Sequence, residues 1–468
     1  MKNLLNKKLL LFAILFSFSQ EIFAQFVLSG EYRPRLEYRD GYKKLNTMDD
    51  APAFFVSQRT RLNLGYKNDR FNTYLSLQDV RTWGNQSQLV GNEANAFSVH
   101  EAWGEVYFAK SNVFSMKFGR QEIDLDDARI FGNVGWAQEA RSHDALIFKY
   151  KNPKILEVNL GAAYNQNMAA LTNTSYTVAG SYKTMQYLWL NKKFVDNKLG
   201  VSLLFLNKGD EVTNDNDNDG KIEKGEYWDN YSQTVGTHIN FKQDKFGASL
   251  NAYYQTGKVA EYRGSLKTPR SISAFNVGLD LNYEVVKGLT MFAGYEYLSG
   301  NSQTDTTIAY NNVNHAYNPF FGTNHKFNGY MDYFYVGNHL NTVGLNDIYF
   351  KLKYKNDKFN IGADYHAFLT GAGLRDTDIL NTDPTKKMNS FLGSEIDLYA
   401  GFPITKGVSF NINYSIMMAT KGMEALKGGD RKQFNNYAYC EIIIKPVFFD
   451  SDKFMEKKLE KQAELLQK

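Results

Sequence analysis

The chain has 468 residues, and its 54 Lys and Arg against 50 Asp and Glu leave a formal net charge of +4, too close to neutral to indicate nucleic-acid binding. One cysteine excludes a framework of intrachain disulfides. Aromatic residues reach 15% of the chain and only 8 prolines occur, a composition that favours uninterrupted strands with aromatic girdles.

Residues 1–24 have the pattern of a secretory signal peptide. A basic start precedes an apolar stretch from Leu9 to Phe18, and "IFA" offers a cleavage site after Ala24. We therefore predict that the mature protein leaves the cytoplasm. No later apolar run reaches the roughly 20 residues that a membrane-spanning helix needs.

Beyond the signal peptide the dominant pattern is an alternation of apolar and polar residues. In "VSFNINYSIMMAT", Val408, Phe410 and Ile412 point one way, and the intervening Ser and Asn point the other. Such runs exceed the usual 5–6 residues of a globular strand and suit a tilted membrane strand of about 9–11 residues. We predict that residues 25–449 form one all-β domain, a transmembrane antiparallel up-and-down β-barrel with a polar, water-filled lumen.

Eight short turns and nine long connections alternate along the chain. The turn "YKNDRFN" at 66–72 recurs as "YKNDKFN" at 354–360, and six looser versions follow the same hairpin chemistry. The long polar connections lie near residues 40–52, 84–95, 124–141, 168–181, 209–230, 258–270, 302–340, 372–389 and 421–433. Seventeen joints predict eighteen strands, enough for an aqueous channel. Short periplasmic turns and long outer loops indicate the outer membrane of a Gram-negative bacterium, with both termini periplasmic.

Charged residues dominate the inward-facing positions of the first predicted strands. In "FVLSGEYRPRLEYRD" the residues Glu31, Arg33, Arg35, Glu37 and Arg39 occupy alternate positions, and "FFVSQRTRLNLGY" places Arg59 and Arg61 in the same way. Ten of the 14 arginines fall between Arg33 and Arg141. Because a charge on the lipid face costs roughly 2–4 kcal/mol at mid-membrane, we predict that most of these side chains face the lumen.

A one-sided cluster of guanidinium groups in a pore favours anions, since each group can hold a carboxylate through two parallel hydrogen bonds. Rings of Arg or Lys select anions in the same way. Interleaved Asp and Glu would keep the arginines ordered. The alternative is an ion-pair network that only bridges strands across a polar lumen.

The segment "NDNDNDGKIEKGE", residues 214–226, matches the twelve-residue calcium loop of an EF-hand, with Gly220 at position six. The predicted Ca²⁺ ligands are Asp215, Asp217, Asp219, Lys221, Glu223 and Glu226. Strands rather than helices flank the segment, so we predict an extracellular loop that binds Ca²⁺ weakly and gains rigidity. The alternative is a solvated loop that matches by chance.

Residues 450–468, "DSDKFMEKKLEKQAELLQK", follow the last strand and form a predicted periplasmic C-terminal tail. The segment has the pattern of a short amphipathic helix capped near Ser451. A frayed charged tail is the alternative.

Five segments, in this order, resemble the alginate export family of outer-membrane barrels: "FFVSQRTRLNLGY", "SLQDVRTWG", "HEAWGEVYF", "KFGRQEIDLDDARIFG" and "WAQEARSHDAL". The likeness covers nearly all of the mature chain and is densest in residues 30–150. It implies an eighteen-stranded barrel whose electropositive constriction passes anionic polyuronate chains. By resemblance, the pore-lining cations are Arg33, Arg59, Arg61, Arg120, Arg129 and Arg141, and the lumen acids are Glu101, Asp124, Asp126 and Asp144. Arg35 joins them from the alternation alone.

We predict an anion-selective channel that passes an alginate-like anionic polysaccharide or shorter uronate oligomers. A general or organic-acid-selective nutrient porin is the alternative, and a non-conducting adhesin or calcium-binding structural barrel is a third reading. No enzyme is predicted, because the chain lacks GxSxG, P-loop and CxxC motifs. Expected partners are outer-membrane lipid, the transported anions, and periplasmic export or uptake components.

Overall fold

The computed structural model describes residues 24–88, 97–108, 112–217, 219, 222–263, 266–378 and 382–466. The predicted signal peptide lies outside these residues, apart from Ala24. Within the described ranges, no helix has the length and apolar character needed to cross a bilayer.

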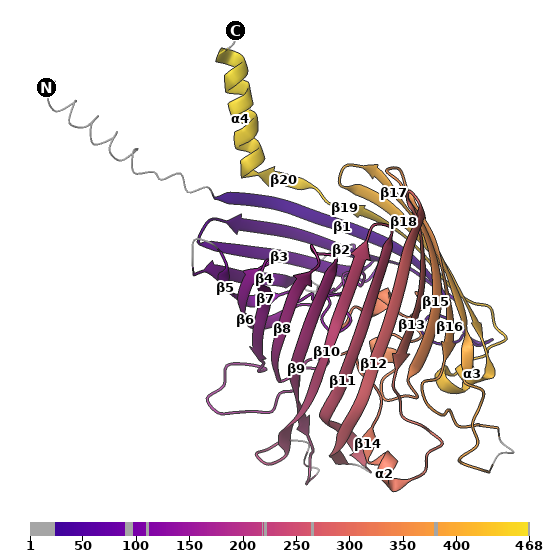
Figure 1. Ribbon diagram of the computed structural model, residues 1–468. Coiled ribbons are helices and arrows are strands. Elements are labelled where there is room, and N and C mark those ends of the chain that lie inside the picture. The colour runs from indigo at the N-terminus through magenta and orange to yellow at the C-terminus, as the bar shows by residue number, and fades with distance from the viewer. Residues whose placement is uncertain are drawn as a thin grey trace, which may run out of the picture.

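Eighteen antiparallel strands form one closed barrel (Figure 1). Consecutive strands of the barrel pair with each other, and the first closes the cylinder by pairing with the last, from Tyr32↔Ile444 to Asp40↔Asn436. The strands are β1 (Gln25–Asp40), β2 (Ala53–Lys67), β3 (Phe71–Thr82), β4 (Phe97–Tyr107), β5 (Phe114–Gln121), β6 (His143–Asn152), β7 (Leu156–Tyr164), β8 (Thr184–Phe194), β9 (Leu199–Thr213), β10 (Tyr227–Gln243), β11 (Phe246–Arg263), β12 (Leu266–Val286), β13 (Leu289–Leu298), β15 (Leu345–Lys355), β16 (Asn360–Leu369), β17 (Phe391–Thr405), β18 (Val408–Ala419) and β19 (Asn435–Ile444). The predicted fold class and strand number are confirmed.

Two short strands and several short helices complete the secondary structure. β14 (Val313–Asn314) pairs in parallel with β12, and β20 (Val447–Asp450) pairs with the start of β1. The helical elements are α2 (Ile308–Asn311), η1 (Asn324–Lys326), η2 (Val336–Asn338), α3 (Lys421–Lys427) and α4 (Ser451–Leu466).

The two ends of the barrel differ as predicted. The short turns join consecutive strands at one end, which also carries the start of β1 and helix α4, and the long loops gather at the other (Figure 1). This asymmetry identifies the turn end as periplasmic and the loop end as extracellular.

The alternating pattern separates a lipid face from a lumen face. On β15, Ile348, Phe350 and Leu352 are exposed on the outer surface, whereas the intervening Asp347 is buried inside. Successive side chains of a strand point to opposite faces, so one apolar residue in two suffices for a lipid-facing wall.

One long connection predicted from the sequence is occupied by paired strands instead. Residues 258–270 were expected to be a long connection, but β11 and β12 pair without a break from Phe246↔Tyr283 to Arg263↔Leu266. Gly257 and Pro269 suggest a turn locally, yet the cross-strand ladder accommodates both. Gly257 has a φ of +98°, and a Cβ there would lie 2.4 Å from the Tyr231 carbonyl oxygen. The expected loop at 209–230 is likewise shortened to 214–226, because β9 and β10 extend into it.

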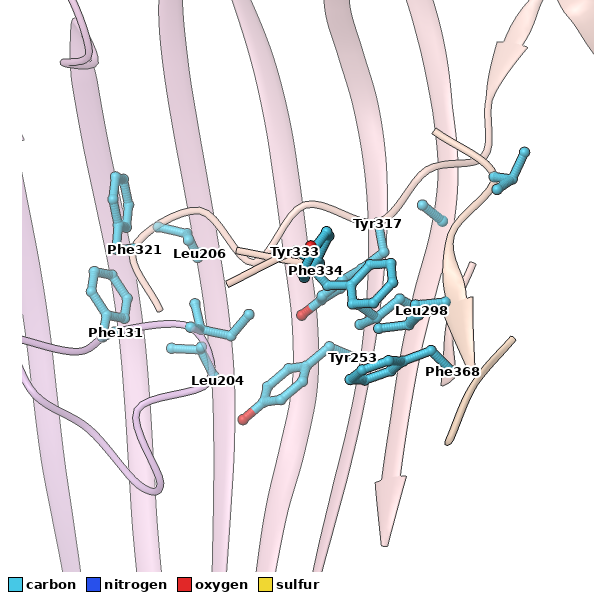
Figure 2. Close-up of a cluster of buried hydrophobic side chains, with 14 of the residues drawn as sticks. Phe131, Leu204, Leu206, Tyr253, Leu298, Tyr317, Phe321, Tyr333, Phe334 and Phe368 are labelled. Atoms are coloured by element: carbon cyan, nitrogen blue, oxygen red, sulfur yellow. The ribbon is translucent and has the colours of Figure 1, made fainter. Parts of the chain in front are cut away.

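The apolar core of the protein lies inside the barrel, where two long loops fold inward. These are the 122–142 loop, between β5 and β6, and the 299–344 loop, between β13 and β15. Their Phe131, Phe321, Tyr317, Tyr333 and Phe334 pack against inward-facing wall residues (Figure 2). The wall residues labelled in Figure 2 are Leu204, Leu206, Tyr253, Leu298 and Phe368. A wide cylinder is thus filled partly by its own loops.

The segment after β20 is helical. α4 begins at Ser451, whose Oγ accepts a hydrogen bond from the Phe26 backbone N–H at 2.9 Å. The Phe449 and Phe454 rings lie 6.0 Å apart, which fixes the start of the helix beside β20. The helix then leads away from the barrel (Figure 1).

Candidate functional site

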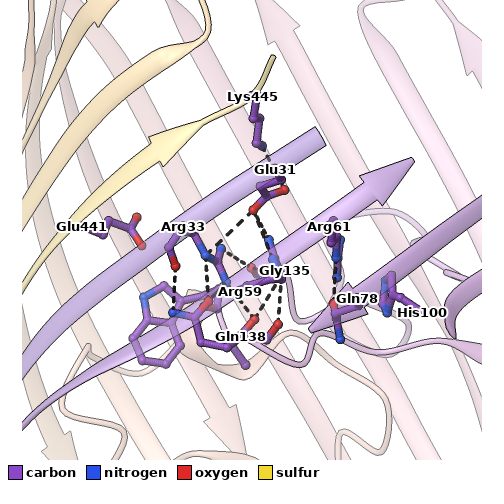
Figure 3. A network of polar contacts seen from close by, with 12 residues as sticks. Glu31, Arg33, Arg59, Arg61, Gln78, His100, Gly135, Gln138, Glu441 and Lys445 are labelled. Carbon is purple, nitrogen blue, oxygen red and sulfur yellow. Dashed lines mark hydrogen bonds and ion pairs between the residues drawn. The ribbon is translucent and has the colours of Figure 1, made fainter. Parts of the chain in front are cut away.

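The arginines of β1 and β2 face the lumen, as their alternation predicts. Arg33 is 5% exposed, Arg59 4% and Arg35 1%, and their strands pair in register through Arg33↔Arg59. Glu31 accepts hydrogen bonds from Arg59 (Figure 3). Glu441 of β19 accepts one from Arg35 at 3.0 Å. The cluster therefore contains its own counter-ions.

The 122–142 loop occupies these arginines. Arg33 donates to the carbonyl oxygens of Gly135 (2.8 Å), Trp136 (3.1 Å) and Ala137 (3.0 Å), and to Gln138 Oε1 (3.1 Å) (Figure 3). Arg59 also reaches carbonyls of this loop, at 3.3–3.4 Å. A guanidinium carries five donors in a fixed fork, which suits a group of backbone carbonyls that have no strand partner.

The remaining arginine contacts strengthen the same attachment. Arg35 donates to the Trp136 carbonyl at 2.6 Å and lies over its ring at 4.2 Å. Arg61 donates to Gln78 Oε1 at 2.7 Å, and Gln78 donates onward to the Glu139 carbonyl at 3.0 Å. Their predicted role as a lining for a transported anion stays a prediction, because loop atoms take up much of their donor capacity.

Two more of the predicted arginines lie in or beside the inward loops. Arg129, 2% exposed, forms an ion pair with Glu296 of β13 and lies 4.4 Å over the Phe327 ring. Arg141 donates to the Gly322 carbonyl at 3.1 Å. Both side chains thus connect the 122–142 loop with β13 or the 299–344 loop.

The predicted acids Glu101, Asp124 and Asp126 have different surroundings. Glu101 accepts hydrogen bonds from the Trp103 indole and the Glu122 N–H, both at 3.0 Å. Asp126 accepts hydrogen bonds from Trp189 Nε1 and from Ser202 Oγ, across the lumen on β8 and β9. Asp124 is an exposed residue of the same loop.

Arg120 and Asp144 do not face the lumen, so their predicted position is corrected. They are directly opposite on β5 and β6, form an ion pair at 3.0 Å, and share the outward row with Phe118 and Leu146. Their side chains are 42% and 61% exposed. At the extracellular ends of two short strands, the pair neutralises itself and avoids the full cost of a charge at mid-membrane.

The two inward loops meet inside the barrel. Gly132 N–H donates to the Phe321 carbonyl at 2.8 Å, and Thr323 N–H donates to the Ala128 carbonyl at 2.9 Å. The Trp136 and His325 rings stack at 3.6 Å. The 299–344 loop therefore lies inside the lumen, joined to the 122–142 loop by backbone and ring contacts.

A pocket of about 260 Å³ lies between these loops and the inner face of β11 to β16. Its charged residues include Lys326 from the 299–344 loop and Lys351 and Lys353 from β15. The other wall residues that matter here are Asp280, Phe292, Glu296, Phe327, Asp347, Tyr349 and His366.

Most charges around the pocket are paired with one another. Glu296 pairs with Arg129, and Asp347 contacts His366 at 2.9 Å. Lys351 pairs with Asp364 at 3.2 Å. Among the described residues, Lys326, Lys353 and Asp280 have no ion pair within 4.0 Å, and Lys326 Nζ donates to the Asp127 backbone carbonyl. Tyr349 Oη donates to Asp280 at 3.2 Å. Sequence reasoning missed this wall, although "LNDIYFKLKYK" shows Asp347, Tyr349, Lys351 and Lys353 at every second position.

Two groups in the described part of the chain bring three metal-ligating side chains within 4.8 Å of one another. One is His100, Glu101 and Glu122, where Arg61 lies 3.9 Å from Glu122 and competes with a cation. The other is Asp215, Asp217 and Asp219 of the predicted calcium loop.

The calcium-like loop is partly described, and the predicted ligand Lys221 and the glycine Gly220 lie outside the described residues. Asp219 N–H donates to Asp215 Oδ1 at 3.1 Å, which folds the acids together. Glu226 accepts hydrogen bonds from the N–H groups of Asn216 (2.7 Å) and Glu223 (3.0 Å). The carboxylate of Glu226 thus closes the loop on itself, and Ca²⁺ binding stays a prediction.

No family profile and no curated protein matches the chain. Solved structures do match. Acinetobacter baumannii OccAB1 has a TM-score of 0.58 at 12% identity, with 91% of this chain and 97% of that chain covered. The outer membrane protein OprD from Pseudomonas aeruginosa has a TM-score of 0.54 at 11% identity, covering 90% and 94%. Pseudomonas aeruginosa OpdK with vanillate gives 0.53 at 9% identity, covering 91% and 98%.

These matches correct the resemblance drawn from sequence. The identification with the alginate export family is wrong, because the solved structures that share the fold are OprD and Occ porins. The motif order that suggested the family follows from features common to wide outer-membrane barrels, namely alternating strands and charged lumen residues. The chain has the β-barrel fold of Gram-negative outer-membrane porins.

Proposed function

We propose that this barrel is an uptake channel for small organic acids, particularly those that carry a second hydrogen-bonding group such as a hydroxyl or amine. The observation that carries the proposal is the pocket of about 260 Å³ at the meeting point of the inward loops, with Lys353 on its wall. Lys353 has no counter-ion within 4.0 Å among the described residues, so a carboxylate in transit finds an ammonium group still available.

The negatively charged Asp280 on the pocket wall narrows the class of solute that the pocket fits. Asp280, held by the Tyr349 hydroxyl at 3.2 Å, can accept a hydrogen bond from a hydroxyl or ammonium group. Phe292 and Phe327 offer apolar surface, and the Lys353 ammonium lies 5.2 Å from the Phe292 ring centre. A solute with one carboxylate, one donor and a small apolar body matches these three features.

Two further observations support a small solute. The inward loops are joined to each other by backbone hydrogen bonds and fill part of the lumen, which favours a small solute over a polymer. One of the matched structures holds vanillate, a small aromatic carboxylate, in a barrel of the same fold.

The test is ion selectivity and solute flux of the purified barrel in planar bilayers and liposomes. Lys353→Gln should lower the anion-to-cation permeability ratio by about two- to fivefold, because one ammonium contributes on the order of 1 kcal/mol in a hydrated pore. Lys192→Gln is the matched control, since Lys192 lies on the outward row of β8 with Leu188. Equal ratios in the wild type and Lys353→Gln would contradict the proposal. Free entry of neutral sugars larger than the pocket would favour a general porin instead.

A further inference from the structure

Two carboxyl groups lie buried side by side beneath the 299–344 loop. Glu395 and Asp397 both point inward from β17 and are both 0% exposed. Ser415 of β18 donates to Asp397 Oδ1, and the second oxygen of each carboxyl group, Glu395 Oε2 and Asp397 Oδ2, is buried without a hydrogen-bond partner. Neither belongs to the pocket proposed for solutes.

This pair differs from the acids around it, because each of its neighbours has a base of its own. Asp364 pairs with Lys351 at 3.2 Å, Asp347 with His366 at 2.9 Å, and Asp332 with His325 at 2.8 Å. Among the described residues, no Lys, Arg or His nitrogen lies within 4.0 Å of the Glu395 or Asp397 oxygens. Burial of two unpaired negative charges costs several kcal/mol for each ion, so the pair needs another source of neutralisation.

With no base within reach, the remaining source of neutralisation is a proton on one of the two groups. An ionised carboxylate only accepts hydrogen bonds, whereas a protonated carboxyl group donates one. Two neighbouring buried carboxyl groups cannot both ionise at low cost, so one keeps a proton that it can donate to the other, and the pair carries one negative charge. Glu395 Oε2 and Asp397 Oδ2, both buried without another partner, are the oxygens available to this proton.

The 299–344 loop rests on the pair. Met331 N–H donates to Glu395 Oε1 at 2.7 Å. Gly329 lies so close that a Cβ there would be 2.5 Å from Glu395 Oε1 and 2.7 Å from Oε2, and its φ of +83° also favours glycine. Residues 329–331 thus cover the carboxyl group, which leaves no room for water while the loop stays in place.

We propose that Glu395 and Asp397 form a proton-dependent latch for the 299–344 loop. With the shared proton in place, the pair carries one charge and the loop closes over it. Loss of the proton puts two adjacent negative charges under residues 329–331. Their repulsion and their need for hydration both favour lifting of the loop, so the passage widens at alkaline pH.

Other titratable groups surround the latch and must be separated from it in the test. β16 contributes Asp364 and His366 opposite the pair, β18 contributes none at the paired positions, and the loop contributes Asp332. Nearby tyrosines are Tyr330, Tyr333, Tyr399 and Tyr439. The acids and histidines among these are paired with partners other than Glu395 and Asp397.

Two amide variants fix the latch in its protonated form. In Glu395→Gln, the amide oxygen still accepts from Met331 and the amide nitrogen donates to Asp397. Asp397→Asn tests the same bond from the other side. Glu441→Gln is the matched control, because Glu441 is also a buried lumen acid but pairs with Arg35 at 3.0 Å.

Amide hydrogen exchange of residues 327–333 in the full-length barrel measures the latch directly. Comparison of the wild type with Glu395→Gln at the same pH cancels the chemical pH dependence of exchange. Between about pH 6 and about pH 9, the exchange rate in the wild type divided by that in the variant should rise by about tenfold. A tenfold change corresponds to a one-unit difference in proton affinity between the closed and the lifted loop. Potassium chloride conductance should rise in parallel in the wild type and in Glu441→Gln only.

The outcomes separate cleanly. A wild-type transition that disappears in both amide variants and persists in Glu441→Gln supports the latch. A transition that persists in Glu395→Gln and Asp397→Asn overturns it, as does a rate ratio that stays constant across the pH range. Because neither readout uses an organic acid, failure of the latch leaves the proposed substrate class standing, and the reverse also holds.

Discussion

Arg33→Met should release the 122–142 loop from the barrel wall. Arg33 donates to three loop carbonyls and to Gln138 Oε1, all within 3.1 Å, from a position that is 5% exposed. Three of these acceptors keep a second donor, because Arg35 also reaches the Trp136 carbonyl and Arg59 reaches those of Gly135 and Ala137. Only Gln138 Oε1 loses its arginine donor entirely.

Because most acceptors keep a second donor, the loss of docking free energy in Arg33→Met is smaller than the number of lost bonds implies. A charge-assisted hydrogen bond contributes about 1.5–3 kcal/mol and an unsatisfied buried acceptor costs about 1–3 kcal/mol, so we expect docking to weaken by about 2–3 kcal/mol rather than by the sum of four bonds. At 1.4 kcal/mol per decade, the loop amides should exchange roughly 30- to 150-fold faster.

Hydrogen exchange of residues 133–139 in the folded barrel measures this directly, and single-channel recordings should show larger current fluctuations. Arg39→Met is the matched control, since Arg39 lies on the same face of the same strand but pairs with Glu37 at 2.6 Å. Unchanged exchange of residues 133–139 in Arg33→Met would refute the view that the arginines serve to hold this loop.

Three further predictions address other parts of the molecule. Burial lowers the pKa of Lys427 on α3 from 10.5 to about 7 while its Nζ donates to the Asn338 carbonyl at 2.5 Å. The docked state therefore binds fewer protons than the released state between about pH 7 and pH 10.5, so docking gains stability as pH rises through that window. The exchange rate of amides 337–340 in the wild type, divided by that in Lys427→Met at the same pH, should fall between about pH 6 and about pH 9, and a constant ratio would count against it. Wild-type protein should bind Ca²⁺ with a Kd of about 10⁻⁴ to 10⁻³ M by calorimetry, and Asp217→Asn should abolish binding while Asp244→Asn in a periplasmic turn should not. Identical binding in both variants would exclude the 215–226 loop as the site. Arg120→Met should leave ion selectivity unchanged, because its side chain lies on the outer row with Phe118, and a shift as large as that of Lys353→Gln would show that it faces the lumen.

The strands could be predicted because apolar residues that face lipid alternate with polar residues that face the lumen along each strand. On β15, Ile348 and Phe350 meet lipid while Asp347 and Lys351 meet the lumen, and the same rule holds around the cylinder. The short turns are local as well, since Asn, Asp, Gly and Lys adopt hairpin conformations without distant help. Both features depend on neighbours in sequence, which is why the strand number emerged correctly.

The inward loops could not be predicted, because their positions depend on residues far away in sequence. Trp136 meets Arg35, about a hundred residues earlier, and Met331 meets Glu395, some sixty residues later. The alternation of apolar and polar residues places Arg33 in the lumen, but it does not predict that backbone carbonyls of the 122–142 loop accept its hydrogen bonds there. Arg120 and Asp144 were misplaced for a related reason, since each looks costly on the lipid face alone and acceptable there only as a pair at the strand ends.

The contacts of Arg33 and Lys353 differ between two parts of the barrel wall, β1 with β2 on one side and β15 on another. A loop that enters a water-filled lumen exposes carbonyl groups that no strand satisfies, and each must find a donor or water. The guanidinium groups of β1 and β2 supply those donors, and this accounts for the concentration of arginine early in the chain without reference to a substrate. A cation that already holds the protein together has little left to offer a passing anion. Under the proposed function, the charge that selects an anion comes from a side chain such as Lys353, which lines the pocket and has no counter-ion within 4.0 Å among the described residues.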